Sequence, residues 1–475
     1  MGGPRARLYV LLISLASLLV AALRWFTRAR VADDYDSMNF LLGMSRYDLS
    51  KFQPQFPGYP VFMALGTALH RLGLAPLTAA VAISCLAAGA STLGLASIAW
   101  RLAGPRAALA SIPLQAVAWL PWLLGSGALS DSLGVSLAIA SFALVIAETP
   151  HPLLGGIAGA LMLGVRLSYW PLALSLLVVV LLRQRQVAFA AGFGAGLAAW
   201  LVPFVAVVGM KNLMHLGRVH VAGHFGQWGG SVVTKPNLWR RAGAFARDIF
   251  YDGLAPSVWA LAAIAVVVVA LSILERDRLR ALPWRPVLLV LAPYALWAFF
   301  AQNILEQPRH VLPLVEGLLL LLAMVLCSSN LAQVAVFALM LVVSGRLALE
   351  RDAVPPAAAQ AADWLATHQT AGDTLVAGTR SVRFFQAEAD RVSPPPFQVR
   401  EDPWLSGLIG ELARVDRLPS ALWVTSEVDL HSGAGDTAPL PSQWQLDPGP
   451  TFCRDARIDR FQPCLLLLQL TWRPH

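Results

Sequence analysis

Long apolar runs recur along the first 349 residues and are separated by short polar loops. Runs such as "LAAIAVVVVALSIL" and "VEGLLLLLAMVLC" approach the roughly 20 apolar residues that a helix needs to cross a bilayer core. The pattern predicts eleven membrane-spanning helices, at residues 8–23, 78–99, 107–125, 131–148, 153–166, 167–183, 187–209, 254–274, 286–304, 310–327 and 331–349. The chain is therefore expected to be a polytopic α-helical membrane protein.

Two apolar segments need separate treatment. The run at 8–23 follows Arg5 and Arg7 like a secretory signal, but no small-x-small cleavage site precedes "RWFTRAR". We interpret it as a retained anchor. The run within 57–72 has about 14 residues and is broken by prolines, a length typical of re-entrant or interfacial segments.

Composition agrees with a membrane protein and divides the chain. Hydrophobic residues make up 57% and charged residues only 13%, against about 25% charged residues in soluble domains. Residues 1–349 hold 25 basic and 12 acidic residues, whereas residues 350–475 hold 11 and 16. This predicts a membrane domain at 1–349 and a water-soluble domain at 350–475. The basic excess fits pairing with membrane lipid headgroups or a phosphate-bearing lipid substrate, and no nucleic-acid partner is expected.

The C-terminal domain alternates helical and strand-like patterns. Helices are predicted at 357–369 and 403–415, and strands at 373–378, 421–428 and 464–472, which make a small α/β domain. Cys453 and Cys464 flank a polar loop. They fit either a disulfide in an oxidising compartment or two free thiols.

Basic loops set the expected topology. Arginine clusters favour the cytoplasm for the loops near residues 101–106, 183–185 and 276–285. The N-terminus is then inside, while loops 24–77 and 210–253 and the C-terminal domain lie outside, provided that 57–72 does not cross. Arg24, Arg28 and Arg30 oppose this orientation.

Ionisable residues gather at the predicted outer boundary of the membrane. Such groups near bilayer depth cost roughly 2.5–3.5 kcal/mol each, so they indicate function. A carboxylate there can act as a general base towards a hydroxyl, and arginines can hold a phosphate. This set predicts glycosyl transfer from a lipid phosphate with inversion. It comprises Asp33, Asp34, Asp36, Asp131, Arg166, Glu306, Arg309 and His310.

Structural alternatives exist for several of these residues. Asp131 also suits the N-cap of the following helix. Arg309 and His310 also suit interfacial anchors whose charged ends snorkel to the membrane surface. Asp36 and Asp48 are expected to be solvated loop residues. Asp33 and Asp34 are harder to explain in this way, because capping requires only one of two adjacent carboxylates.

An ordered set of motifs resembles the GT-C membrane glycosyltransferases, especially the branch of protein O-mannosyltransferases and lipid A aminoarabinose transferases. The motifs are "DDY" at 33–35, "FPGYPVFMAL" about twenty residues on, "ALSD" at 128–131, "GVRLSYWPLAL" at 164–174 and "QPRHVLPLVEGLLLLLA" from residue 307. Their order and spacing fit the family over most of residues 1–349.

The resemblance implies roles for matching residues. Asp33 would be the catalytic base, Asp34 would support it or help to hold a metal, and Asp131 matches a second acidic position. Arg166, Arg309 and His310 would face the phosphate of a polyprenyl-phosphate sugar donor, with His310 standing where the family often has tyrosine. Tyr59 and Glu306 are expected to contact substrate. The sequence itself requires no metal or other cofactor.

Loop 210–253 is rich in histidine, tryptophan and glycine. His220 and His224 have the spacing of a metal pair on one helical face. Gly223 and the following "GQWGG" argue against a long helix, so we favour a mobile loop over sugar or lipid, with His224 and Trp228 as substrate contacts.

The expected function is transfer of a sugar from a polyprenyl-phosphate donor to an envelope acceptor (a lipid, a glycan or a protein) at the outer face of a bacterial inner membrane. The active site and the C-terminal domain would lie on the periplasmic side. One alternative is a transporter or flippase of lipid-linked sugars, although no internal repeat of the transporter kind is evident. Another is an envelope polysaccharide polymerase or ligase.

Overall fold

The structure, a computed structural model, describes residues 4–182, 185–227, 229–368, 374–390, 395–401, 408–409, 412, 419–428, 443–460 and 462–472. The chain forms two compact units. The first comprises Met1–Arg30 and Phe40–Asp352, and the second comprises Val31–Asn39 and Ala353–His475. The segment 31–39, expected to be part of the membrane domain, thus groups with the C-terminal residues.

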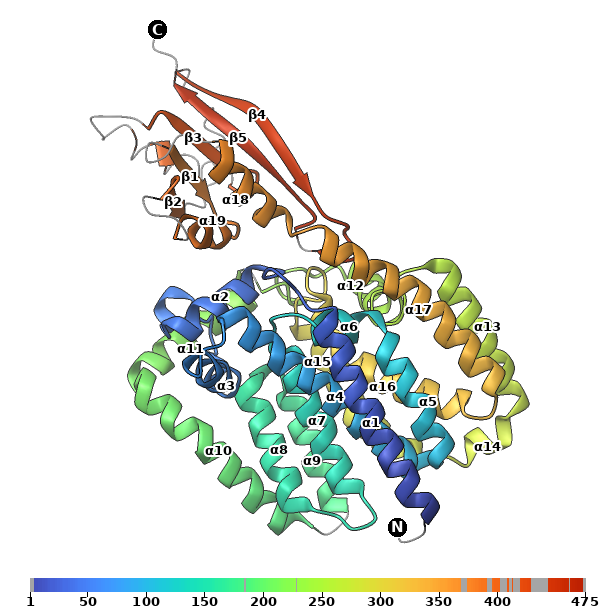
Figure 1. The fold of residues 1–475 in the computed structure, drawn as a ribbon. Coiled ribbons are helices and arrows are strands. Elements are labelled where there is room, and N and C mark those ends of the chain that lie inside the picture. The colour runs from blue at the N-terminus through green and yellow to red at the C-terminus, as the bar shows by residue number, and fades with distance from the viewer. Residues whose placement is uncertain are drawn as a thin grey trace. The chain divides into compact units, whose positions relative to one another are not determined.

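The first unit is built from helices, as the apolar runs predict (Figure 1). Its α-helices are α1 (Pro4–Phe26), α3 (Pro60–Arg71), α4 (Pro76–Ala103), α5 (Pro105–Val117), α6 (Trp119–Gly125), α7 (Asp131–Ile146), α8 (Pro152–Val165), α9 (Trp170–Leu182), α10 (Gln186–Val208), α11 (Met210–Gly226), α12 (Leu238–Ala246), α13 (Val258–Leu274), α14 (Arg276–Arg280), α15 (Trp284–Ala301), α16 (Leu312–Leu326) and α17 (Asn330–Ala353). Shorter turns are η1 (Leu49–Lys51), η2 (Leu167–Tyr169), η3 (Arg247–Tyr251) and η4 (Pro308–Val311). The helix α2 (Tyr35–Ser45) begins in the second unit and ends in the first.

Among the described residues, six helical segments are long and apolar enough to cross a membrane: Arg7–Phe26, Pro76–Ala103, Gln186–Val208, Trp284–Ala301, Pro308–Leu326 and Asn330–His368. The pair α5 and α6 would add a seventh, although it bends by 65°. The bend is explained by Pro121, which has no backbone N–H and therefore cannot donate a hydrogen bond to the carbonyl oxygen of Val117, where α5 ends. Four further apolar helices are shorter: Asp131–Ile146, Pro152–Val165, Leu167–Leu182 and Val258–Leu274. The interrupted run at 57–72 forms only the 12-residue helix α3.

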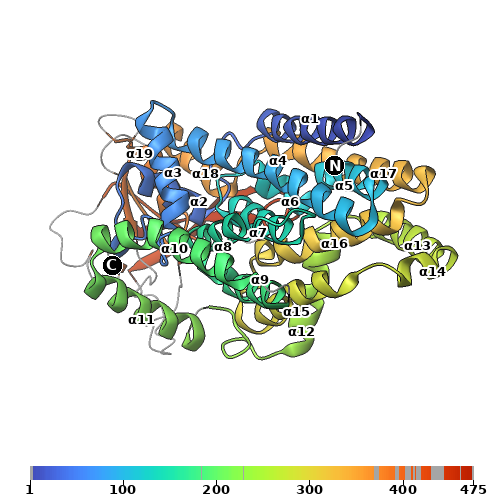
Figure 2. The ribbon, with the colours of Figure 1, turned by 90° about the horizontal axis from the view of Figure 1, so that it is seen from below.

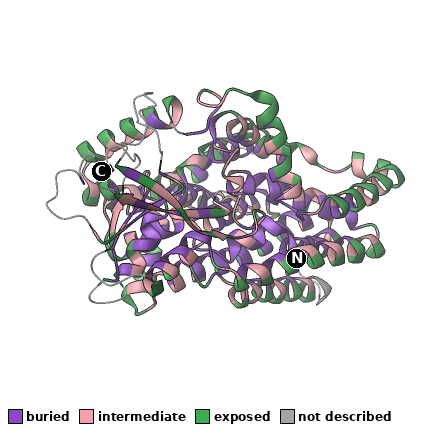
Figure 3. Ribbon diagram, turned by 90° about the horizontal axis from the view of Figure 1, so that it is seen from above, coloured by how far each residue is buried: buried purple, intermediate pink, exposed green. Residues whose placement is uncertain are grey.

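Within this unit α8 lies between α7 and α10 (Figures 1 and 2). Glycine permits the contact with α10, because a Cβ on Gly156 would lie 2.1 Å from the carbonyl oxygen of Phe189. Gly192 on α10 is equally close to the carbonyl oxygen of Leu153. Small residues allow such close helix packing in membranes. Buried residues concentrate in the middle of the bundle (Figure 3).

The expectation of no long helix after residue 210 is wrong. The helix α11 runs for 17 residues through Gly217 and Gly223 and ends at Gly226. A glycine lowers helix stability by only about 1 kcal/mol relative to alanine. Packing of α11 against α10 and Phe56 offsets this cost.

In the part of the second unit that the structure describes, five strands form one sheet with the order β2-β1-β3-β5-β4. Its elements are α18 (Ala357–His368), β1 (Thr374–Gly378), α19 (Val382–Ala389), β2 (Gln398–Glu401), β3 (Ala421–Thr425), β4 (Trp444–Cys453) and β5 (Cys464–Trp472). The strand β1 pairs in parallel with β2 and β3, while β5 is antiparallel to β3 and β4. This confirms a small α/β domain. The helix predicted at 403–415 falls largely outside the described residues.

The sequence pattern missed β4 for a physical reason. This edge strand contains Pro448 and Pro450, and its pairing with β5 shifts register between Pro448 and Thr451. Proline is confined to such edge positions because it cannot donate to the ladder. Cys453 is the last residue of β4 and Cys464 the first of β5, and the two form a disulfide.

Candidate functional site

Asp131 is the first residue of α7 and lies inside the protein. The N-cap is Ser130, so Asp131 is not the cap itself, although a carboxylate in the first turn is still favoured by the helix dipole. Its Oδ2 lies 2.9 Å from Nη1 of Arg166, and the two side chains are 0% and 5% exposed respectively. A buried ion pair therefore joins the start of α7 to another element.

That element is the break between two apolar helices. Arg166 has an extended backbone after the last residue of α8 and immediately before η2. Its guanidinium also lies over the ring of Tyr169, 5.4 Å from the centroid, and its Nη2 is 3.4 Å from Nδ1 of His310. The break thus points one arginine towards both an acid and a histidine.

Arg309 and His310 belong to η4, directly before α16. The hydroxyl of Tyr294 donates to the carbonyl oxygen of His310 at 2.8 Å, which fixes this turn against α15. Arg309 is only 8% exposed and lies within electrostatic range of Arg166. Burial inside the protein does not fit a lipid-facing snorkelling anchor. The structure therefore brings Asp131, Arg166, Arg309 and His310 together at one end of the bundle; we call these four residues the charged cluster.

An apolar cavity of about 680 Å³ adjoins the charged cluster. Val165 and Leu167, the two neighbours of Arg166, line it, as does Tyr59, which precedes α3 in a left-handed conformation. The remaining walls come from α3, α8, α10, α11 and the segment before α3; they include Phe56, Pro60, Trp200, Phe204, Leu213, Met214, Gly217 and Arg218. A mostly hydrocarbon-lined space thus ends beside buried cations.

The acidic pair of the first loop lies in the second unit, where its two members differ. Asp34 caps α2, because its Oδ1 accepts from the backbone N–H of Ser37 at 2.7 Å and from the Ser37 hydroxyl at 2.8 Å. Asp33 instead pairs with Arg454, with 3.2 Å between Oδ1 and Nη1. Asp33 is the less buried partner, at 18% exposure.

The other predicted substrate contacts are held by local partners. Glu306 pairs with Lys235 and accepts from Nδ2 of Asn303 at 2.9 Å. His224 lies 2.9 Å from the carbonyl oxygen of Ala301 through Nε2. Trp228 lies outside the described residues.

His220 and His224 share one face of α11, as their spacing predicts, with ring centroids 6.0 Å apart. Burial, and secondarily His224, lowers the pKa of His220 to about 4. Its ring packs at 4.9 Å from that of Phe56. No cluster of three or more histidine, cysteine or acidic side chains suited to a metal occurs among the described residues.

The sequence matches no known protein family and no curated protein. Among solved structures, ArnT from Cupriavidus metallidurans bound to undecaprenyl phosphate aligns over 88% of this chain and 92% of its own, with 12% identity and a TM-score of 0.53. The apo form of the same protein aligns over 89% and 93%, with 13% identity and a TM-score of 0.53. The chain has the GT-C fold. The Archaeoglobus fulgidus oligosaccharyltransferase with a tethered acceptor peptide is also similar, at 11% identity and a TM-score of 0.46 over 88% of this chain and 69% of its own.

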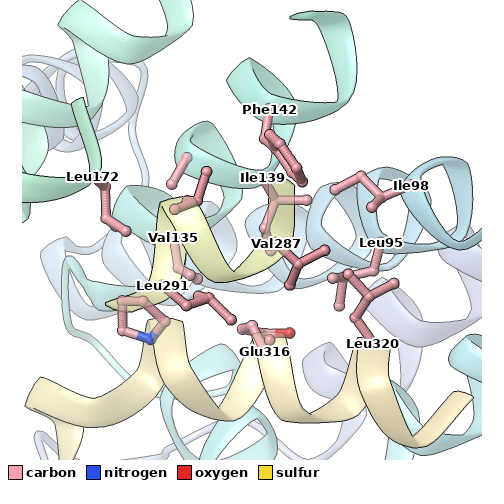
Figure 4. A pocket seen from close by; sticks show the side chains of 14 residues that line it. Leu95, Ile98, Val135, Ile139, Phe142, Leu172, Val287, Leu291, Glu316 and Leu320 are labelled. Carbon is pink, nitrogen blue, oxygen red and sulfur yellow. The ribbon is translucent and has the colours of Figure 1, made fainter. Parts of the chain in front are cut away.

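Within this GT-C fold a second buried group lies apart from the charged cluster. Glu316 on α16 is 3% exposed, and its Oε1 accepts from Nε2 of Gln115 at 2.9 Å. Its Oε2 has no hydrogen-bond partner among the described residues. Figure 4 shows Glu316 among aliphatic and aromatic side chains that line a cavity of about 60 Å³.

Several residues of these sites carried no sequence signal. Tyr169 and Tyr294 looked like ordinary aromatic residues of apolar runs, but both are fully buried beside the charged cluster. Arg454 and Lys235 are single basic residues in irregular segments. They became of interest only when the structure showed their ion pairs with Asp33 and Glu306 respectively.

Proposed function

We propose that this protein is a membrane glycosyltransferase that moves a sugar from a polyprenyl-phosphate donor to an acceptor of the cell envelope. The reaction would take place at the outer, periplasmic face of a bacterial inner membrane. The observation that carries the proposal is the charged cluster at the end of an apolar cavity of about 680 Å³. The GT-C fold shared with a protein that binds undecaprenyl phosphate supports it.

The donor contains an isoprenoid chain and a phosphate, which match the apolar cavity and the charged cluster respectively. The isoprenoid chain would occupy the apolar cavity, where burying each methylene group contributes about 0.8 kcal/mol. The phosphate would bind Arg309 and Arg166 through charge-assisted hydrogen bonds, with His310 beside them. Asp131 would act through Arg166, because its buried carboxylate fixes the direction of that guanidinium.

Asp33 would serve as the general base. Its carboxylate would take the proton of the acceptor hydroxyl while the hydroxyl oxygen bonds to the anomeric carbon. The bond from that carbon to the phosphate oxygen would break, and its electron pair would leave with the polyprenyl phosphate. A single displacement of this kind inverts the anomeric centre. Asp34 would position Asp33 by capping α2.

Substrate contacts are proposed for Tyr59, Glu306, His224 and Trp228. Tyr59 supports this role because it lines the apolar cavity and lies within electrostatic range of Arg166. His224 on α11 contacts Ala301, the last residue of α15, and Glu306 contacts Asn303, two residues later in the chain. Such polar groups can hydrogen-bond sugar hydroxyls.

The test is release of undecaprenyl phosphate from a panel of undecaprenyl-phosphate sugars by the full chain in lipid nanodiscs. Wild type should release it with at least one donor in the presence of cell-envelope extract. Asp33→Asn should lower the rate by roughly 10²- to 10⁴-fold, the usual contribution of a general base. Asp36→Asn, three residues after Asp33 and in the first turn of α2, is the matched control and should stay close to wild type.

A flippase gives the opposite result. It would move a labelled donor across a vesicle membrane without releasing undecaprenyl phosphate from any member of the panel. That outcome would overturn the proposal. A polymerase or ligase would release polyprenyl diphosphate from a lipid-diphosphate-linked glycan instead.

A further inference from the structure

The segment that holds the proposed base is attached to the C-terminal domain. Residues Val31–Asn39 form one compact unit with Ala353–His475. Asp33, Asp34 and Tyr35 border a small cavity of about 10 Å³ together with Phe384 and Gln462 of the C-terminal domain. The base is therefore held, within this unit, by residues that are more than 300 positions later in the chain.

Arg454 makes the charged contact. Its side chain is only 2% exposed, and its Nη1 lies 3.2 Å from Oδ1 of Asp33. An ion pair between two exposed side chains contributes little to stability. The Asp33–Arg454 pair differs, because one partner is almost fully buried, and loss of either charge then has a larger cost. An arginine this deeply buried has few other positions available to its guanidinium.

The backbone around Arg454 is fixed by the end of the β4–β5 hairpin. Cys453, which precedes Arg454, is bonded to Cys464. The N–H of Arg454 donates to the carbonyl oxygen of Pro463 at 2.7 Å, so the residue continues the ladder by one step. The disulfide and this hydrogen bond together fix where the arginine side chain begins.

We infer that Arg454 is a positioning residue for Asp33, held in place by the Cys453–Cys464 disulfide, so that the C-terminal domain controls the geometry and charge of the proposed base. The inference rests on the proposed function of Asp33. Arg454 acts through Asp33 and need not touch substrate. It gives the C-terminal domain a role in the reaction beyond that of an appended module.

Two properties of Asp33 would depend on Arg454. The first is position, since a displacement of about 1 Å in a reacting group can lower a rate about 100-fold. The second is charge, because an adjacent guanidinium favours the ionised carboxylate that a base requires. The ionisable groups that border the small cavity together with Asp33 are Asp34, Tyr35 and Asp459. A second cation of this unit, Arg383, hydrogen-bonds with Tyr35.

A structural test comes first, because it is independent of catalysis. Hydrogen–deuterium exchange of the full chain in nanodiscs should show faster exchange of the amides of residues 34–39 in Arg454→Ala than in wild type. The double variant Cys453→Ser/Cys464→Ser should show the same change. Arg457→Ala is the matched control, because Arg457 lies in the same loop and pairs with Asp455. Unchanged exchange in both test variants would overturn the inference, whatever the activity.

The second test uses the pH dependence of the rate. Arg454→Ala should lower the rate roughly 10- to 100-fold and move the acid limb of the pH–rate profile to higher pH. Arg454→Lys, which keeps the charge, should restore the wild-type limb and part of the rate. A loss that is equal at every pH and is not relieved by lysine would indicate a merely structural role and overturn the inference. If wild type releases no undecaprenyl phosphate, the proposed function fails, while the exchange experiment still decides whether Arg454 holds residues 34–39.

Discussion

Oδ2 of Asp131 lies 2.9 Å from Nη1 of Arg166, and both side chains are almost completely buried. The pair connects the first turn of α7 to the break between α8 and η2. Taking two charges out of water costs several kcal/mol per ion, so the pair is weak evidence for a purely stabilising role. Its position beside Arg309 and His310 indicates instead that it sets the direction of a guanidinium in the charged cluster.

Removal of one member of this pair should be costly. Asp131→Asn leaves Arg166 buried with no carboxylate partner at that position, and such a change destabilises by about 3–5 kcal/mol. The double variant Asp131→Asn/Arg166→Gln should recover part of the loss in thermal unfolding of the detergent-solubilised protein. Glu275→Gln is the control, since the Arg278–Glu275 pair is about one-third exposed and should contribute no more than about 1 kcal/mol. Equal unfolding temperatures for Asp131→Asn and Glu275→Gln would contradict this prediction.

Filling the apolar cavity should weaken binding of a polyprenyl phosphate. Gly217 lines the cavity, and a Cβ there would make only van der Waals contact with Phe56 at 3.4 Å, so Gly217→Leu is compatible with the fold. The leucine would displace part of the lipid chain. At about 0.8 kcal/mol per methylene group, loss of two such groups weakens binding roughly tenfold.

The measurement is native mass spectrometry of the protein with undecaprenyl phosphate. Gly194→Leu is the matched control, because Gly194 is exposed on α10 and a Cβ there meets nothing within 4 Å. Tighter or unchanged binding in Gly217→Leu would show that the lipid chain lies elsewhere.

Much of this fold follows directly from the periodicity of the sequence. Apolar runs of bilayer length can hardly be anything other than helices, and the strands at 374–378, 421–425 and 464–472 follow their β-branched and aliphatic composition. The helix α11 could not be predicted, because its glycines lower the local helix propensity and tertiary contacts stabilise the helix instead. Local propensity is a weak guide wherever packing decides.

The candidate site likewise contains residues that the sequence could identify and residues that only tertiary contacts reveal. Arg166, Arg309 and His310 were identifiable because ionisable residues beside apolar runs are rare. The partners of Asp33 and Glu306 were not, because Arg454 and Lys235 are separated from them by 421 and 71 positions. Sequence spacing carries no information about such contacts. The difference between Asp33 and Asp34 also appears only in three dimensions, where one pairs and the other caps.

Acid should destabilise the protein through His220. Burial and His224 lower the pKa of His220 from its ordinary 6.5 to about 4. Below pH 6.5 the unfolded chain therefore binds more protons at this residue than the folded protein does, so stability should fall as the pH drops from 6.5 towards 4. Above pH 6.5 the residue should have no effect on the pH dependence.

His220→Phe tests this, because phenylalanine keeps a ring against Phe56 and cannot be protonated. Its unfolding temperature should decrease less than that of wild type between pH 7 and pH 4.5. His151→Phe is the control, since His151 is exposed in the loop before α8. A wild-type pH dependence in His220→Phe would assign the acid sensitivity to other groups.

Glu316 should be important for the core of the bundle through its hydrogen bond to Gln115. Glu316→Gln keeps the side-chain volume and an acceptor for Nε2 of Gln115, so its effect on stability should be small. Glu316→Ala instead enlarges the cavity of Figure 4 and leaves that amide without its partner. An unsatisfied buried donor costs about 1–3 kcal/mol, and the lost packing adds to this cost. The unfolding temperatures of wild type and Glu316→Gln should therefore be similar, and both should be well above that of Glu316→Ala. Glu316→Ala combined with Gln115→Leu should recover part of the difference, because leucine has no polar group that needs a partner; if it recovers none, the hydrogen bond is not the source of the loss.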